Sequence, residues 1–254
     1  MPLSHRIPYL LLTRGPISGF PVPADTVAGR AHSVNGPSLG TAADERGRGG
    51  AITGNRQASW AFADAFVAED DALIRARARS HAAGLRPVSP GTGAALRLLA
   101  AAGDAKSVVE IGTGTGVSGI HLLRGMRPDG VLTTVDSEPD RQQLAREAYR
   151  EAGFIGNRSR FICGRALDVL PRLTDGGYDL VHLDCGPSDH VAQFSQALRL
   201  VRPGGVVVIS GVLRAEPEAR TLLEHIGIEH GASCAVLPIG DGMLVMSTVS
   251  TSAK

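Results

Sequence analysis

The second half of the chain alternates between short apolar runs and longer segments with helical periodicity. Runs rich in valine, isoleucine and leucine, such as Val108-Val-Glu-Ile111, have the length and composition of buried strands. Between these runs the apolar residues recur at helical spacing, as they do from Val117 to Arg127. Units that alternate in this way form a parallel sheet with helices on both faces. The pattern predicts strands at 107–111, 131–136, 159–163, 178–184 and 205–210, with a helix in each gap.

The C-terminal end of the chain departs from this alternation. Residues 232–238 and 243–248 are two strand-like runs, and Ile239-Gly-Asp-Gly242 between them predicts a hairpin. The sequence therefore predicts an α/β protein of Rossmann-like architecture. Its sheet is expected to be seven-stranded and mostly parallel, to end in an antiparallel hairpin, and to carry helices on both faces.

The first part of the chain has a different character. Residues 1–55 contain many glycine, proline, serine and threonine residues without a sustained period, so we expect a disordered N-terminal extension. One domain, 56–254, follows, with N-terminal helices at 56–104 and the Rossmann-like core at 105–254. A helix beginning near Ala58 is predicted to have four apolar side chains on one side: Trp60, Phe62, Phe66 and Val67. A second helix is predicted at 92–101, and its apolar residues are Leu96, Leu98 and Leu99.

The composition argues against several classes of partner. The 26 basic and 25 acidic residues nearly balance and aromatic content is 4%, so neither charge nor base stacking favours nucleic acid. The 3 cysteines lie far apart without zinc-ligand spacing, which suits a reducing compartment. The apolar run at 7–12 is too short to span a membrane. We therefore expect a cytoplasmic protein with a small-molecule partner and no nucleic-acid or membrane partner.

The residues with the most chemical content follow the first predicted strand. Glu110 lies near the end of that strand, and Gly112-Thr-Gly-Thr-Gly116 comes next. Glycines allow a tight turn and a close approach of the backbone to a ligand. The helix that follows presents free N–H groups at its N-terminus. This arrangement predicts a nucleotide-like cofactor at the loop.

Two cofactor classes compete for this loop. Gly114-Thr-Gly-Val-Ser-Gly119 matches the dinucleotide fingerprint, which favours an NAD(P)-dependent oxidoreductase. Glu110 favours S-adenosyl-L-methionine, because a carboxylate would repel a pyrophosphate and attract the α-ammonium group of a methionine moiety. Asp136, which ends the second predicted strand, can accept both ribose hydroxyls of either cofactor.

From about Trp60 onward the chain resembles the bacterial, actinobacterial-type members of O-methyltransferase family 3. This is the catechol/caffeoyl-CoA O-methyltransferase-like group of class I S-adenosylmethionine-dependent methyltransferases, whose sheet also ends in an antiparallel hairpin. The segments that carry the resemblance are Val88-Ser-Pro-Gly-Thr-Gly93, 109–118, Thr134-Val-Asp136, Gly164-Arg-Ala166, 178–184 and Leu200-Val-Arg-Pro-Gly-Gly205.

The resemblance implies an S-adenosylmethionine-dependent O-methyltransferase that acts on a small hydroxylated acceptor. It also implies that the helices before the first strand form an acceptor lid and a dimer contact, so a homodimer is one expected assembly. The implied cofactor-binding residues are Val88 near the cofactor, Glu110, Gly112, Thr113, Gly114 and Ser118 at the methionine end, Asp136 at the ribose, Ala166 beside the adenine, and Asp184 at the carboxyl end of the fourth strand.

The chain departs from the family pattern where metal-dependent relatives bind a divalent cation. Such relatives pair the acid at the position of Asp184 with an Asp-Asn pair, and here those two positions are Ser210 and Gly211. A hard cation prefers several oxygen ligands, most of its counter-charge coming from carboxylates. The lysine that serves catechol O-methyltransferases as a base is replaced by Pro187. We therefore expect no metal ligands and no bound divalent metal.

A hydroxyl acceptor must still lose its proton, which favours a base that titrates near neutral pH. His182 and His190 are candidates, with Asp184 and Asp189 as alternatives. The position of His182 inside a strand favours a core histidine, whereas His190 follows the strand end. Asp184 and His190 are therefore taken as the catalytic candidates. Because the Asp-Asn pair of metal ligands and the lysine base are absent, a second hypothesis stays open: the protein binds the cofactor but is catalytically degenerate.

Overall fold

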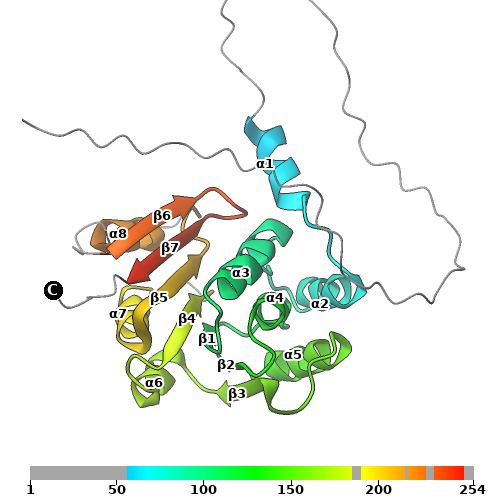
Figure 1. Ribbon diagram of the computed structural model, residues 1–254. Helices are drawn as coiled ribbons and strands as arrows, with labels where there is room; N and C mark the ends of the chain where they lie inside the picture. The colour runs from blue at the N-terminus through cyan, green and yellow to red at the C-terminus, as the bar shows by residue number, and fades with distance from the viewer. Residues whose placement is uncertain (1–55, 185–189, 215–216, 227–231, 249–254) are drawn as a thin grey trace, which may run out of the picture. The chain divides into compact units, whose positions relative to one another are not determined.

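The computed structural model describes residues 56–184, 190–214, 217–226 and 232–248. The predicted N-terminal extension, 1–55, lies outside the described residues. Within them the chain forms a seven-stranded sheet with helices on both faces (Figure 1). The strands are β1 Ser107–Ile111, β2 Val131–Asp136, β3 Ser159–Cys163, β4 Tyr178–Leu183, β5 Val201–Ser210, β6 Ala232–Leu237 and β7 Met243–Thr248.

The strands lie in the order β3-β2-β1-β4-β5-β7-β6. The first five are parallel to one another, whereas β7 pairs antiparallel with both β5 and β6. The order reverses beside β1, so the carboxyl ends of β1, β2 and β4 meet at a switch point where open α/β sheets bind ligands. The predicted fold class is confirmed, including the C-terminal hairpin.

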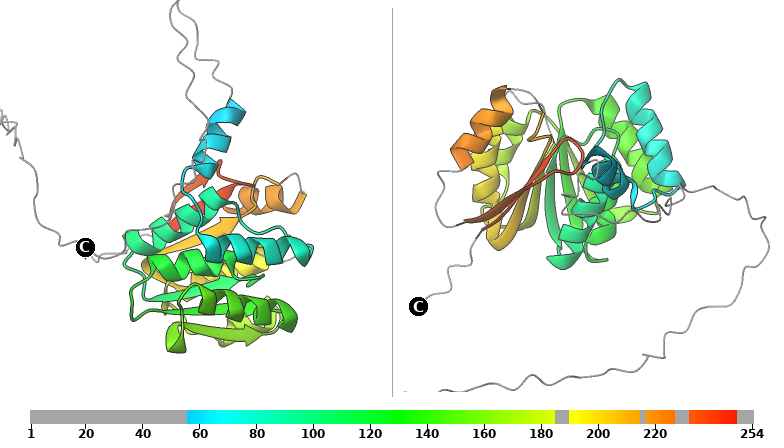
Figure 2. Two further views of the ribbon diagram at one scale, coloured as in Figure 1. Left: turned by 90° about the vertical axis from the view of Figure 1, so that its right-hand side faces the viewer. Right: turned by 90° about the horizontal axis from the view of Figure 1, so that it is seen from above.

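Consecutive strand residues point to opposite faces and supply two separate cores. Val108 packs with helices α2, α3, α4 and α5, while Val109 packs with α6, α7 and α8. Figure 2 shows these two groups of helices on either side of the sheet. The helices are α1 Arg56–Ala65, α2 Asp71–Ala82, α3 Pro90–Ala102, α4 Val117–Gly125, α5 Pro139–Glu151, α6 Ala166–Val169, α7 His190–Leu200 and α8 Pro217–Ile226, with 3₁₀ turns at Gly156–Arg158 and Leu170–Arg172.

The predicted elements exist, with shifted ends and two errors in side-chain placement. The fourth strand ends at Leu183 rather than at residue 184, and the fifth begins at Val201 rather than at 205. Leu98 was expected in the apolar set of α3, but it is 67% exposed, because a residue two positions from the buried Leu96 points to the opposite side of the helix. The aromatic residues of the first predicted helix, Trp60, Phe62 and Phe66, are exposed as well, and Phe66 is 74% exposed. Among the described helices, none is both long and apolar enough to cross a lipid bilayer.

Candidate active site

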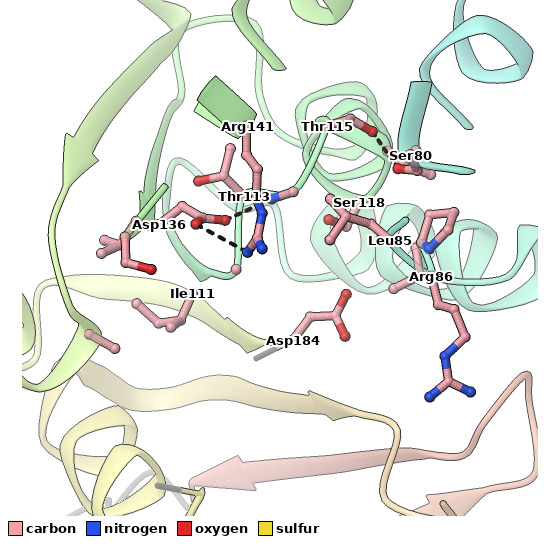
Figure 3. A pocket seen from close by; sticks show the side chains of 18 of the residues that line it. Ser80, Leu85, Arg86, Ile111, Thr113, Thr115, Ser118, Asp136, Arg141 and Asp184 are labelled. Atoms are coloured by element: carbon pink, nitrogen blue, oxygen red, sulfur yellow. Dashed lines mark hydrogen bonds and ion pairs between the residues drawn. The ribbon is translucent and has the colours of Figure 1, made fainter. Parts of the chain in front are cut away.

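A cavity of about 420 Å³ opens at the carboxyl ends of β1, β2 and β4 (Figure 3). Its position is the one expected for the ligand of an open α/β sheet. The structure brings eight of the nine predicted cofactor-binding residues to its wall. They are Val88, Gly112, Thr113, Gly114, Ser118, Asp136, Ala166 and Asp184.

The glycine-rich loop owes its shape to left-handed backbone angles and to Asp136. Gly112 and Gly116 have φ values of 96° and 91°, a region that favours glycine. The carboxylate of Asp136 accepts hydrogen bonds from the N–H groups of Gly114 and Glu138, both at 3.0 Å. Arg141 approaches the same carboxylate at 3.8 Å. Asp136 therefore holds the loop and lines the cavity at once.

Glu110 is the one predicted cofactor-binding residue that does not line the cavity. Its side chain is fully buried behind the loop and accepts hydrogen bonds from Ser118 at 2.5 Å and Thr134 at 2.8 Å. Burial, together with the negative charge of Glu110, raises the pKa of the adjacent Tyr149 hydroxyl well above its usual range. Contact of Glu110 with the methionine ammonium stays a prediction. The arrangement shows directly that Glu110 orients Ser118.

Asp184 follows β4 and lies at the centre of the cavity wall, where Figure 3 shows its carboxyl group directed into the open space. Its backbone N–H donates to the carbonyl oxygen of Ile111 at 2.8 Å, which fixes the residue at the strand end. Desolvation raises the pKa of its carboxyl group, although His182 and Arg214 oppose this shift. Asp184 is therefore placed to contact a ligand and holds a proton more tightly than an exposed aspartate.

A second, smaller cavity of about 80 Å³ adjoins the first. The two share Pro87, Val88 and Arg214, and Ser210 and Gly211 line only the smaller one. Arg214 is held by Asp241, whose carboxylate accepts a hydrogen bond from Nε at 2.9 Å. The smaller cavity therefore has mostly small polar walls and one fixed cation.

The residues predicted as candidate bases lie in different surroundings in the structure. His182 is fully buried, and its Nε2 lies 2.9 Å from the Ser210 hydroxyl, as expected for a core histidine with a partner. His190 begins α7 rather than lying in a loop, and its side chain lies outside the described residues. Asp189 and Cys185 also lie outside them. The catalytic assignment of Asp184 and His190 stays a prediction.

The residues at the positions where the resemblance implies a metal site do not fit a divalent cation. The Ser210 hydroxyl is already engaged by His182, and Gly211 has no side chain to contribute. The guanidinium group of Arg214 lies over Gly211, where a Cβ would stand 2.9 Å from Cζ of the arginine. Within the described part of the chain, no group of three histidine, cysteine, aspartate or glutamate side chains is arranged to hold a metal. A single carboxylate beside a guanidinium is a poor cation site.

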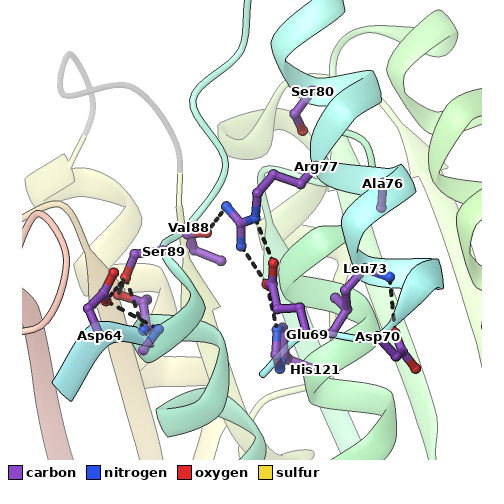
Figure 4. Close-up of polar contacts among 12 residues, drawn as sticks. Asp64, Glu69, Asp70, Leu73, Ala76, Arg77, Ser80, Val88, Ser89 and His121 are labelled. Carbon is purple, nitrogen blue, oxygen red and sulfur yellow. Dashed lines mark hydrogen bonds and ion pairs between the residues drawn. The ribbon is translucent and has the colours of Figure 1, made fainter. Parts of the chain in front are cut away.

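One partly buried ion pair near the site gave no signal in the sequence. Arg77 donates to both carboxylate oxygens of Glu69, at 2.8 and 2.6 Å, and to the backbone oxygen of Val88 at 2.7 Å (Figure 4). His121 lies 3.5 Å from the same carboxylate. The pair fixes the segment that carries Val88, which lines both cavities. Side chains on one helix meet when they are three or four positions apart, but Glu69 precedes α2 and lies eight positions before Arg77, so this spacing could not predict the pair.

Replacing Glu69 with glutamine (Glu69→Gln) tests this pair. Burial alone would raise the pKa of Glu69, but its contacts with Arg77 and His121 more than offset this and lower the pKa from 4.5 to about 2. The stabilisation is therefore present above about pH 4.5 and lost as the pH falls toward about 2. Because the pair is partly buried, its contribution lies between those of an exposed and of a fully buried ion pair. We expect Glu69→Gln to lower the free energy of unfolding by on the order of 2 kcal/mol at pH 7, measured by denaturant titration.

The matched control is Glu224→Gln, which breaks an exposed ion pair with Arg220. Its effect on the free energy of unfolding should stay below about 1 kcal/mol. The difference between the wild type and Glu69→Gln should narrow as the pH is lowered below 4.5. A difference that is the same at pH 7 and pH 3.5 would contradict the assignment.

Sheet order, hairpin and glycine loop together define the class I methyltransferase architecture. The family model described as O-methyltransferase matches residues 67–248. A probable O-methyltransferase of Mycobacterium tuberculosis is 44% identical over 198 residues, covering 73% of this chain and 88% of its relative. The protein belongs to the O-methyltransferase family, as the resemblance implied.

Solved structures show the same fold. The O-methyltransferase TomG from Streptomyces achromogenes, solved in complex with SAM, has a TM-score of 0.68 and 30% identity, covering 76% of this chain and 98% of that one. An O-methyltransferase from Bacillus cereus, solved in complex with SAH, has a TM-score of 0.67 and 26% identity, covering 75% and 99%. These matches confirm the predicted class of enzyme and do not favour the oxidoreductase alternative.

Proposed function

We propose that the protein transfers a methyl group from S-adenosylmethionine, bound in the larger cavity, to a hydroxyl oxygen of a small molecule. The observation that carries this proposal is the convergence of eight residues, predicted from separate segments, on one cavity at the switch point of the sheet. The related structures solved in complex with SAM and with SAH support the choice of donor.

The cavity wall suggests how the donor is held. Asp136 accepts hydrogen bonds from the two ribose hydroxyls, and Ala166 lies beside the adenine. The backbone of Gly112, Thr113 and Gly114 receives the methionine end together with Ser118. The position of Asp136 at the end of β2 and of the glycine loop at the end of β1 supports this placement.

The acceptor enters through the smaller cavity, and no metal takes part in binding it. The shared residues Val88 and Arg214 place this cavity beside the donor site. Methyl transfer from a sulfonium group is an in-line displacement, so orientation and exclusion of water supply much of the rate. Arg214 offers a fixed positive charge to an oxygen-rich acceptor.

Isothermal titration with S-adenosylhomocysteine and with NADH tests the donor assignment. We expect S-adenosylhomocysteine to bind and NADH not to bind, and tight binding of NADH alone would overturn the proposal. Methylation of a panel of phenols, assayed with Mg²⁺ and with EDTA, tests the reaction. Activity that disappears in EDTA would contradict the metal-free site. A protein that binds S-adenosylhomocysteine but methylates nothing would support the degenerate alternative.

We also propose that the protein is a cytoplasmic homodimer in which α1 contributes to the contact. Trp60 and Phe62 on this helix are exposed, and so is Phe66 just beyond it. The free thiols of Cys163 and Cys234 suit a reducing compartment. Light scattering of the wild type and of Phe62→Ser tests the assembly, and a monomeric wild type would contradict it.

A further inference from the structure

Three buried side chains on adjacent strands connect the back of the glycine loop with the smaller cavity. They are Glu110 on β1, His182 on β4 and Ser210 at the carboxyl end of β5. Glu110 and His182 are register partners, which places the Oε1 of Glu110 3.7 Å from the Nδ1 of His182. The Nε2 of His182 lies 2.9 Å from the hydroxyl oxygen of Ser210, a residue of the cavity wall.

The surroundings of His182 favour one tautomer of its ring. The carboxylate of Glu110 already accepts from Ser118 and Thr134, so it is held as an acceptor. Nδ1 of His182 is buried without a hydrogen-bond partner among the described residues, and Glu110 is the acceptor that faces it. A proton on Nδ1 is directed at Glu110 and leaves Nε2 free to accept the hydrogen of Ser210. Contacts of this kind often shorten in a reacting complex.

We propose that Ser210 and His182, oriented by Glu110, form the proton relay that deprotonates the acceptor hydroxyl. This proposal rests on the proposed function and adds the base that it lacks. Ser210 is the catalytic residue, because it meets the acceptor. His182 and Glu110 are positioning residues that act through it, in the order carboxylate, imidazole and hydroxyl.

The step balances in protons and electrons. The acceptor hydroxyl gives its proton to the Ser210 oxygen while Ser210 gives its own proton to Nε2 of His182. The acceptor oxygen forms a bond to the methyl carbon, and the carbon–sulfur bond breaks. Its electron pair stays on sulfur, which changes from a sulfonium to a neutral thioether. The proton returns through Ser210 to water after the product leaves.

The charges around His182 can support the imidazolium that forms. The carboxylate of Glu110 lies 3.7 Å from Nδ1 of His182, and Asp184 at the end of β4 also interacts electrostatically with the ring, so two carboxylates are placed to attract a positive charge that forms there. Arg214 lines the same cavity as Ser210, and its positive charge is paired with Asp241. Ser210 stands where metal-dependent relatives have a carboxylate, so a hydrogen-bonded hydroxyl takes the place of an expected metal ligand.

The tautomer of His182 gives a test that needs no acceptor. In protein labelled with ¹⁵N-histidine, NMR should show His182 protonated at Nδ1 with Nε2 as an acceptor. Its signal is assigned by its change in Ser210→Ala, in which the Nε2 resonance should shift. Ser195→Ala, an exposed serine on α7, is the matched control and should leave it unchanged. A ring protonated at Nε2 in the wild type would overturn the relay.

Methyl transfer to two phenols tests the chemistry. With 4-methylphenol, whose hydroxyl is weakly acidic, Ser210→Ala should lower kcat roughly a hundredfold. With 4-nitrophenol, whose hydroxyl is far more acidic, the loss should fall below about fivefold, because removing its proton needs little help from a base. Equal losses with both phenols would show a merely structural role for Ser210 and overturn the proposal.

Titration of S-adenosylhomocysteine into each variant separates this proposal from the proposed function. We expect Ser210→Ala to bind it as the wild type does, which shows an intact donor site. If the wild type binds S-adenosylhomocysteine but methylates neither phenol, phenols are not its acceptors. The relay is then tested by the tautomer of His182 alone. A wild type that does not bind it would overturn the proposed function and the relay together.

Discussion

Replacing Asp136 with alanine (Asp136→Ala) should weaken binding of S-adenosylhomocysteine by at least about a hundredfold. The carboxylate is proposed to accept two ribose hydroxyls, and each hydrogen bond to a charged group contributes roughly 1.5–3 kcal/mol. The change also removes the acceptor that holds the N–H of Gly114, so the glycine loop loses its anchor. Both effects act on the donor site, and isothermal titration measures their sum.

Asp140→Ala is the matched control, because Asp140 lies in the first turn of α5, close to Asp136 in the sequence, and is exposed. Its affinity for S-adenosylhomocysteine should stay within about twofold of the wild type. Asp136→Asn should fall between the two, since an amide keeps one acceptor oxygen but loses the charge. If Asp136→Ala binds as tightly as the wild type, the ribose does not lie at the end of β2.

Replacing Gly119 with alanine (Gly119→Ala) should lower the free energy of unfolding by about 3 kcal/mol. Helix propensity alone predicts the opposite sign, because alanine in a helix interior is favoured over glycine by roughly 1 kcal/mol. In the structure, however, a Cβ at this position would stand 1.7 Å from the hydroxyl oxygen of Tyr149. Tyr149 is fully buried on α5 and cannot withdraw. Thermal melting should shift down by roughly 10 °C.

A double-mutant cycle with Tyr149→Phe separates this steric overlap from other effects. Removing the hydroxyl takes away the closest atom but leaves ring carbon Cζ at 2.6 Å, so recovery should be partial. The combined variant should therefore be less destabilised than the sum of the two single changes. Strictly additive losses would mean that Gly119 and Tyr149 do not compete for the same space.

The residues that line the larger cavity could be predicted from the sequence because their signals are local. Each of these signals can be recognised in a stretch of about ten residues. They are the apolar run of the first strand, the glycine loop and the acid at the end of the next strand. The parallel sheet then brings the strand ends together whatever the side chains between them. This is why Asp136, Gly114 and Ser118 line one cavity as expected.

The residues that were missed or misplaced depend on contacts between distant parts of the chain. Arg77 gave no signal in the sequence, and the structure pairs it, partly buried, with Glu69 and with the backbone oxygen of Val88. The side chain of Glu110 lies behind the loop and outside the cavity wall, which the sequence did not indicate, and its expected contact with the cofactor stays a prediction. The apolar side chains of a helix could be counted from the sequence, but which of them face inward depends on the neighbouring helix, as Leu98 shows.

The sequence by itself determined the class of fold, the strands, the hairpin and the donor loop, because periodicity and turn chemistry are local properties. Only the tertiary structure decided that Glu110, His182 and Ser210 form one buried row and that Arg214 lies over Gly211. Their sequence positions are far apart, and strand order and register bring them together. No spacing rule predicts such a row, since it depends on which strands become neighbours.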